Sequence, residues 1–488
     1  MSLKDETASG TAIGLRRDAI GLREVLFQSI TDMAPGAAIA ASIPAGAGLA
    51  GGALPLSVVF ALVACLLGAW CIGQLAREMP AAGSLATYAA RGLHPSLGFL
   101  VAWGYVLVGW LIPPLVLLQL GFTTASTINS EFHGYPANLW WPWSLAGAVI
   151  VLAAGYYGIR TSARLGTILG ISEIAVFLVL AVFFLVHAGG HNTGQVFTTH
   201  YSPTGLTGVI GGSVFTLLAF GGFEGAAPLA EETRDPRRTI QRAVLLATLL
   251  IGVLYVFTTY AVDVAYGPKG FIAFATETGN ASWEGLARSL YGLFWFFVFL
   301  AIVNSTIANA NAGVNVSTRT AYAMGRIGAF PHFLALVSPK HRSPIYSVLV
   351  AFVITVAVTL GLGLHYDPTE AFAMVGTGLV IVIVAIYIVM CAACIGYFAR
   401  RRSGFNWLSH LIIPLLGIAA FVPAWLTAAG IKVFSFVTPL APPLSYMGPG
   451  VAGFMVLGVI YMIILYRTNP QRVSDVGLVH LDALEETT

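Results

Sequence analysis

The chain has 488 residues, of which 57% are hydrophobic and only 9% are charged. A soluble domain carries roughly 25% charged residues, so this composition indicates a polytopic membrane protein and excludes an ordinary soluble enzyme. The net charge of +3 is too small and too scattered along the chain to indicate nucleic acid binding.

Twelve apolar stretches are each long enough to cross about 30 Å of hydrocarbon as a helix. We therefore predict an all-α integral membrane protein with twelve transmembrane helices in one domain, residues 22–466. Polar tails flank this domain at residues 1–21 and 467–488. The predicted spans lie near residues 22–49, 54–78, 97–128, 143–159, 163–187, 206–231, 239–266, 286–312, 345–364, 370–399, 410–432 and 445–466.

Basic residues are strongly biased toward one side of these spans. With the N-terminus in the cytoplasm, all 24 Lys and Arg residues except Lys269, Arg288 and Lys432 fall in cytoplasmic segments. Cytoplasmic loops of membrane proteins carry this excess of positive charge. We therefore expect a multi-pass protein of the cell membrane with both termini in the cytoplasm.

Two predicted spans contain residues that interrupt a membrane helix. The first holds Asp32 followed by MAPGAA at residues 33–38, and the sixth holds FGGFEG at residues 220–225. Freed backbone groups persist at membrane depth only where they line a cavity or are buried in protein. Paired interruptions in two halves of a chain indicate the binding site of a transporter.

The spans divide into two sets of five, over about residues 22–187 and 206–399, in which spans 1 and 6 are equivalent. Because five is odd, the second set starts from the opposite side of the membrane, which gives an inverted-topology repeat. Two additional helices over residues 410–466 follow the repeat.

Three segments resemble signatures of the amino acid–polyamine–organocation (APC) permease superfamily. They are QLAREMPAAGSLATY at residues 74–88, AFGGFE at 219–224 with EETRDP at 231–236, and STRTAYAMGRIG at 317–328 with Pro331. The resemblance implies the leucine-transporter-type five-plus-five fold with discontinuous helices 1 and 6. It also implies secondary active uptake of amino acids or related amines.

A solute between spans 1 and 6 would meet two kinds of helix end. The outer half of span 1, starting near Gly36, offers N–H groups to a carboxylate, and the part of span 6 ending near Gly221 offers carbonyls to an ammonium group. Where the superfamily usually has G-S-G-I in span 1, this chain has APGAAI at residues 34–39 and lacks the Ser hydroxyl. The predicted substrate-binding residues are Ala34, Pro35, Gly36, Ala37, Ala38, Ile39, Ala219, Phe220, Gly221, Gly222, Phe223 and Glu224.

Three acidic residues, Asp32, Glu173 and Glu224, are expected at membrane depth, where carboxyl groups are functional candidates. Glu173 stands where many proton-coupled members of the superfamily carry a Lys, so their coupling scheme does not transfer unchanged. Glu173 alone would carry a proton, whereas its carboxylate together with Ser305 and Asn309 would suit sodium. The predicted ion-coupling residues are Asp32, Glu173, Ser305 and Asn309.

Two of these acids have alternative roles. Glu224 either faces the second amine of a polyamine or hydrogen-bonds to freed N–H groups of span 6. Asp32 either takes part in ion coupling or caps the inner half of span 1.

These features favour a proton-coupled amino acid importer, a symporter that works by alternating access. A polyamine or organocation carrier and an amino acid exchanger, with proton or sodium coupling, stay open as alternatives. A channel needs a continuous pore, which paired mid-membrane interruptions disfavour. No nucleophile–base pair indicates an enzyme, and no ATP-binding motif is present, so we expect an ion gradient to supply the energy.

We predict no metal site and no cofactor, and the expected partners are a small amine-bearing solute and the lipid bilayer. Cys65, Cys71, Cys391 and Cys394 lie in apolar runs without the Cys or His partners of a metal centre, so we interpret them as packing residues. The sequence leaves the oligomeric state open.

Overall fold

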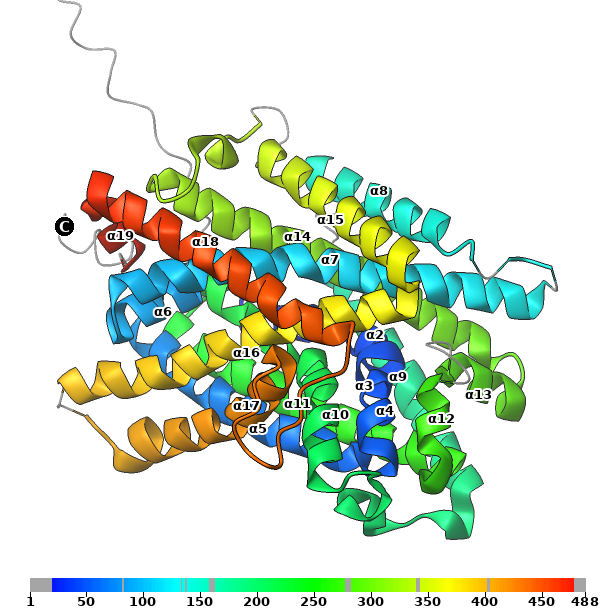
Figure 1. The fold of residues 1–488 in the computed structure, drawn as a ribbon. Coiled ribbons are helices and arrows are strands. Elements are labelled where there is room, and N and C mark those ends of the chain that lie inside the picture. Colours follow the sequence, from blue (N-terminus) through cyan, green and yellow to red (C-terminus); the bar gives the residue numbers. More distant parts are fainter. Residues whose placement is uncertain are drawn as a thin grey trace, which may run out of the picture.

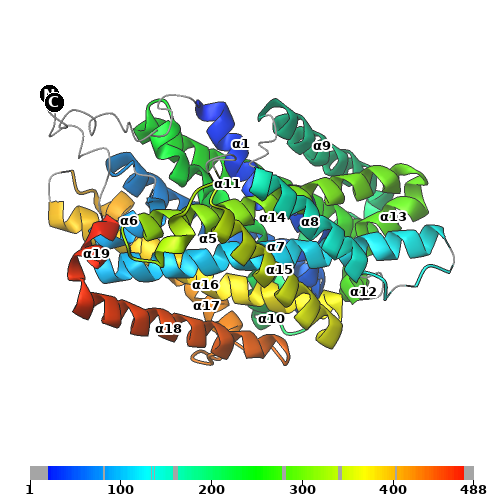
Figure 2. The ribbon, with the colours of Figure 1, turned by 90° about the horizontal axis from the view of Figure 1, so that it is seen from above.

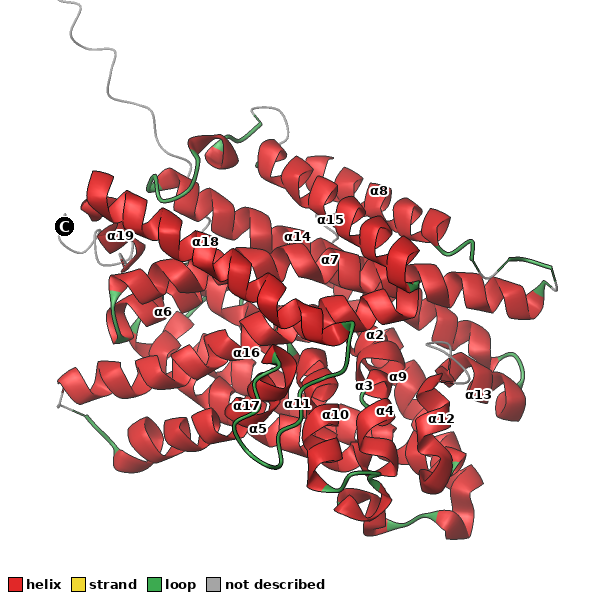
Figure 3. Cartoon of the chain, viewed as in Figure 1, coloured by secondary structure: helices red, strands yellow, loops and turns green. Residues whose placement is uncertain are grey.

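The computed structural model describes residues 20–80, 83–132, 134–136, 138–157, 163–276, 282–338, 343–401 and 404–477. These residues are almost entirely helical, and the one β contact among them is an isolated bridge between Ile20 and Thr233 (Figure 3). The predicted all-α fold is confirmed. Most of the two predicted tails, residues 1–19 and 478–488, lies outside the described residues.

Ten segments of the described chain are long and apolar enough to cross a membrane. One of them, Leu22–Glu78, contains the predicted spans 1 and 2 together. The predicted span 4 corresponds to α8 (Trp141–Tyr157), which runs up to the end of a described range. A multi-pass membrane protein is therefore confirmed, and the count of twelve spans stays a prediction.

The first apolar segment is a chain of short helical pieces that leads into a long helix (Figure 1). Its C-terminal part, α5, is a single uninterrupted helix. The pieces are α1 (Leu22–Met33), α2 (Pro35–Ala37), a π-helical turn at Ala38–Ser42, α3 (Ile43–Ala45), α4 (Ala47–Ala50), a 3₁₀ turn at Gly51–Ala53 and α5 (Leu54–Glu78).

The centre of the fold is formed by two long helices, α7 (Pro95–Glu131) and α14 (Phe294–Arg326), which pack along each other. α8 and α15 (Ile345–Tyr366) cover one side of this pair, as Figures 1 and 2 show. The other side faces α16 (Pro368–Arg401) and the short helical pieces of the first apolar segment.

Small residues let the two central helices approach closely. A Cβ atom added at Gly109 of α7 would lie 2.5 Å from the backbone nitrogen of Ser317 in α14. One added at Gly313 of α14 would lie 2.7 Å from the Cβ of Ile112. Since lipid provides no hydrophobic force between helices, such close backbone contact is a main source of helix association in membranes.

The remaining helices surround this centre. α17 and α18 pack against α16, and in Figure 2 α18 forms one edge of the molecule. The helices not yet given are α6 (Ser84–Gly92), α9 (Ala163–Ala188), α10 (Leu206–Phe220), the 3₁₀ helix η6 (Phe223–Glu232), α11 (Pro236–Tyr266), α12 (Phe271–Thr276), α13 (Ser282–Tyr291), α17 (Ile413–Ala429), α18 (Met447–Thr468) and α19 (Pro470–Ser474).

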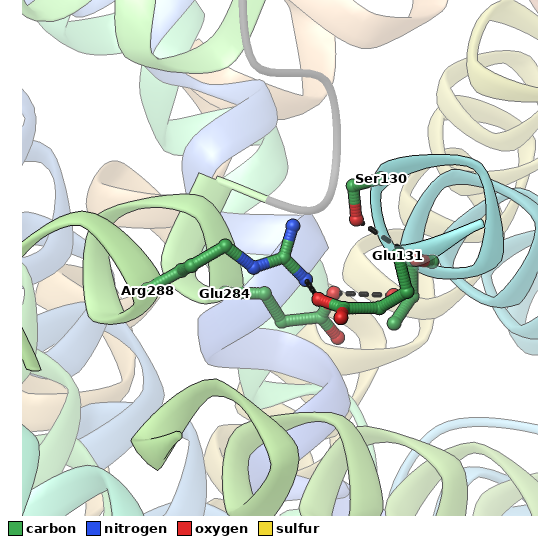
Figure 4. A network of polar contacts seen from close by, with 5 residues as sticks. Ser130, Glu131, Glu284 and Arg288 are labelled. Atoms are coloured by element: carbon green, nitrogen blue, oxygen red, sulfur yellow. Dashed lines mark hydrogen bonds and ion pairs between the residues drawn. The ribbon is translucent and has the colours of Figure 1, made fainter. Parts of the chain in front are cut away.

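The helix α13, which precedes α14 in the chain, forms a cap at the end of α7. Thr127 Oγ1 of α7 donates a hydrogen bond of 2.6 Å to Glu284 Oε2 of α13. Arg288 Nη2 forms an ion pair of 2.6 Å with Glu131 Oε1 (Figure 4). The Trp283 ring lies 5.3 Å from that of Phe177 in α9, so the cap is also fixed by apolar contact.

We predict that the docking of this cap weakens at alkaline pH. Burial raises the pKa of Glu284 from its ordinary value of 4.5 to about 8, against the opposing effects of the Thr127 hydrogen bond and the Arg288 charge. A raised pKa in the folded state gives stability that is full below the ordinary pKa and lost as the pH rises through about 8. The melting temperature in detergent should fall by roughly 3 °C or more between pH 7 and pH 9.

Two variants check the origin of this effect. Glu284→Gln should flatten the dependence because its amide does not titrate. Glu131→Gln, which removes only the partly exposed ion pair, should keep it. A Glu284→Gln variant with the wild-type pH profile would show that another group is responsible.

Candidate substrate and ion-coupling site

The first interruption lies between α1 and α2. α1 ends at Met33, Ala34 adopts the left-handed conformation with φ 46°, and α2 starts at Pro35. Proline favours the first position of a helix because its fixed φ suits the turn and its missing N–H would be unpaired there. Two of the freed carbonyls have side-chain donors: Asn309 Nδ2 donates to Asp32 O at 2.7 Å, and the Tyr255 hydroxyl lies 3.1 Å from Met33 O.

The second interruption follows α10, which ends at Phe220. Gly221 is extended, with φ −54° and ψ 128°, and Gly222 has φ 109°, a region that favours glycine. The chain then continues as the 3₁₀ helix η6. The carbonyl of Ala219 lies 3.1 Å from the same Tyr255 hydroxyl that contacts Met33 O. Both interruptions are present where the sequence predicted them, and one side chain of α11 links them.

The helix α1 packs directly on η6. A Cβ atom at Gly225 would lie only 1.8 Å from Asp32 Oδ2, and one at Gly222 would lie 2.6 Å from the carbonyl oxygen of Asp32. Ser29 of α1 donates to Phe223 O at 2.9 Å and accepts from the Ala226 N–H at 3.0 Å. The two breaks are therefore in mutual contact.

A cavity lies between the broken helices, α7, α14 and α16. It has two acidic groups, Asp32 and Glu224, and no Lys, Arg or His in its lining of described residues. Its lining residues are Asp32, Met33, Ala34, Ala37, Ala38, Ser42, Tyr105, Val108, Ile112, Leu115, Val116, Gln119, Leu218, Ala219, Gly221, Gly222, Glu224, Asn309, Ala312, Val316, Leu379 and Ile383.

The predicted substrate-binding residues divide into two groups by position. Those in the lining are Ala34, Ala37, Ala38, Ala219, Gly221, Gly222 and Glu224. Those outside it are Pro35, Gly36, Ile39, Phe220 and Phe223. Phe220 and Phe223 are fully buried, and their rings pack against Tyr255 and Tyr387 at 5.3 Å and 4.7 Å.

Glu224 is held at the second break by three donors. The Tyr387 hydroxyl donates at 2.7 Å, the Tyr105 hydroxyl at 3.3 Å and the Gly222 N–H at 3.2 Å. Asp32, on the opposite side of the contact, accepts from Gln28 Nε2 at 3.0 Å. The hydrogen-bonding alternative for Glu224 is therefore observed, because its carboxyl group accepts from the Gly222 N–H. Glu224 also lines the cavity, and its role toward an amine stays a prediction.

Glu173 lies behind the first break rather than in the cavity. Asn304 Nδ2 and the Ser305 hydroxyl of α14 donate to its carboxylate at 2.9 Å and 3.3 Å. The backbone N–H of Gly36, at the start of α2, also lies near this carboxyl group. Of the residues grouped with Glu173 from the sequence, Ser305 contacts it, whereas Asn309 donates to the backbone of Asp32.

Sequence reasoning missed four polar side chains of this region: Gln119, Tyr255, Asn304 and Tyr387. Gln119, Tyr255 and Tyr387 each have apolar neighbours on both sides, and that isolation is the signal available in the sequence. Asn304 lacks this signal because Ser305 and Thr306 follow it directly. Their bonding partners depend on how the helices pack, which the apolar pattern does not specify.

The sequence profile of the amino acid permease family matches residues 24–473. The chain belongs to this family. It is thus a permease of the APC superfamily and not an enzyme, as the resemblance of its motifs implied.

Relatives of known function carry amines or amino acids. The chain is 27% identical to the low-affinity putrescine importer PlaP of Escherichia coli (strain K12) over 78% of this chain and 81% of the importer. It is 26% identical to the branched-chain amino acid permease BcaP of Bacillus subtilis (strain 168) over 71% and 75%. It is 25% identical to the mitochondrial cationic amino acid transporter 3 of Arabidopsis thaliana over 68% and 57%.

We predict that Gly222→Ala destabilises the protein whereas Gly221→Ala is tolerated. Alanine at 222 must adopt a positive φ and would place its Cβ 2.6 Å from the backbone of Asp32. This should cost about 2 kcal/mol or more, which thermal unfolding in detergent would measure. At 221 the φ is negative and the nearest atom is 3.2 Å away, so equal stability losses in the two variants would contradict this account.

Proposed function

We propose that the chain is a secondary active transporter that imports an amino acid or a related amine across the cell membrane. It would expose the cavity to the two sides in turn, with both termini in the cytoplasm and with the inverted repeat and twelve spans expected from the sequence. Membership of the permease family and the amine or amino acid substrates of its relatives support this function.

The observation that carries the proposal is the charge of the cavity. Two carboxyl groups, on Asp32 and Glu224, face a lining without basic residues among the described positions. The carbonyl ends of α1 and α10 add partial negative charge at the same place. In a low-dielectric site this arrangement favours a cationic nitrogen and disfavours an anion.

Binding of the carboxylate group of an amino acid has less support in this structure than binding of its amine. The start of α2 is the predicted cradle for it, but the Gly36 N–H lies near the carboxyl group of Glu173. Gly36 also faces α9 and α14, because an added Cβ would lie 3.2 Å from Ala301 O and 3.4 Å from a ring carbon of Phe177. This favours a second candidate substrate, a diamine or polyamine, whose charges are all positive.

A screen of purified protein separates these substrate classes. Putrescine and L-lysine should stabilise the protein in thermal-shift measurements at concentrations about tenfold or more below those needed for L-glutamate, because the cavity repels negative charge. L-Leucine tests a neutral amino acid. Preferential stabilisation by L-glutamate would contradict the charge argument. In a separate uptake measurement, transport that neither saturates nor concentrates the solute would indicate a channel.

We propose Glu173 as the coupling residue. It is 5% exposed, and it joins the break in span 1 to α14, so a change in its protonation alters contacts with both elements. Asp32 lines the cavity and is the second candidate for a coupled proton. Sodium at Glu173 and Ser305 is the alternative, with Asn309 one turn further along α14.

We predict that Glu173→Gln uncouples transport from the proton gradient. In proteoliposomes, uptake driven by an inward proton gradient should fall by about tenfold or more, while exchange of labelled for unlabelled solute changes by less than about twofold. Ser305→Ala, which keeps the carboxyl group, is the matched control. Unchanged proton dependence in Glu173→Gln would exclude Glu173 as the proton carrier, and dependence of uptake on sodium would favour the alternative ion.

A further inference from the structure

Gln119 of α7 has an unusual hydrogen-bond environment. Its side chain is fully buried, and its amide nitrogen Nε2 donates to the carbonyl of Ala37, just after the break in span 1, at 3.0 Å. Its amide oxygen Oε1 has no hydrogen-bond partner among the described residues. Buried polar atoms in folded proteins are nearly always paired, so an unpaired one needs an explanation.

Rotation of the amide group does not resolve this. A backbone carbonyl only accepts hydrogen bonds, so the amide nitrogen must face Ala37 O and the oxygen must point elsewhere. Gln119 also belongs to the lining of the cavity. The unpaired oxygen is therefore an acceptor held in a fixed direction beside the cavity.

Gln119 lies in another part of the cavity lining than Glu224. Tyr105, which donates to Glu224, lies several turns earlier on the same face of α7. The cavity-lining side chains between them on this helix are Val108, Ile112, Leu115 and Val116, and all of them are apolar. The cavity thus has acidic groups in one part, a neutral acceptor in another and an apolar wall between.

We propose that Gln119 Oε1 accepts a hydrogen bond from a second N–H group of the transported solute. The solute is then an elongated molecule with one cationic nitrogen at Asp32 and Glu224 and a second nitrogen beyond an apolar chain, as in an alkyl diamine or a diamino acid. This inference rests on the proposed transport of an amine and assigns a specificity-determining residue to the site.

Pairs of probes that differ by one terminal amine test this role. Binding to the full chain is measured for putrescine against n-butylamine and for L-lysine against L-norleucine. In Gln119→Met, which keeps the shape of the side chain but has no hydrogen-bonding group, the preference for the member with the second amine should fall by about tenfold or more. Thr123→Val is the matched control, because its hydroxyl is buried and unpaired on the same helix but lies outside the cavity lining.

The outcomes are distinguishable. If Gln119→Met weakens both members of each pair by the same factor, Gln119 only supports the Ala37 carbonyl and the inference is wrong. If the wild-type protein binds none of the four probes, the proposed amine transport itself fails. Should Gln119→Met not fold, Gln119→Glu decides, since its carboxyl group keeps an acceptor and should equal or exceed the wild-type preference; a lost preference there overturns the inference.

Discussion

The whole site depends on the satisfaction of backbone groups that two broken helices release at membrane depth. In hydrocarbon each such group needs a partner from the protein, because water is absent. The hydroxyl of Tyr255 lies within hydrogen-bonding distance of the carbonyls of Met33 and Ala219, and Asn309 and Gln119 bond to the carbonyls of Asp32 and Ala37. These contacts come from α11, α14 and α7, so the surrounding helices hold the breaks open and define the cavity.

The placement of the two acidic groups of the cavity follows from the same constraint. Glu224 is placed by the Gly222 N–H and by two tyrosine hydroxyls, and Asp32 is the last residue but one of α1, in contact with Gly225. Glu173, in contrast, lies behind the cavity, where Asn304 and Ser305 of α14 donate to its carboxyl group. The carbonyl ends of the broken helices and the two acids Asp32 and Glu224 are the polar groups left beside the cavity.

The sequence predicted the parts of this arrangement that are local. The Pro and Gly residues beside Asp32 and Glu224 indicated both breaks, since their effect on the backbone needs no tertiary information. The apolar pattern predicted the membrane helices, because a run of apolar residues long enough to cross the bilayer is visible without tertiary information. The partners of Gln119, Tyr255 and Tyr387 were not predictable in this way, because hydrogen bonds between spans depend on helix rotation and close packing at positions such as Gly109 and Gly313.

A phenol group carries a single proton, yet Tyr255 faces two acceptors at equal distance, 3.1 Å each. The hydroxyl can donate one well-aligned hydrogen bond to either carbonyl, or a weaker bond shared between both. The two helix termini therefore compete for one hydroxyl proton, and the geometry of each break depends on that of the other.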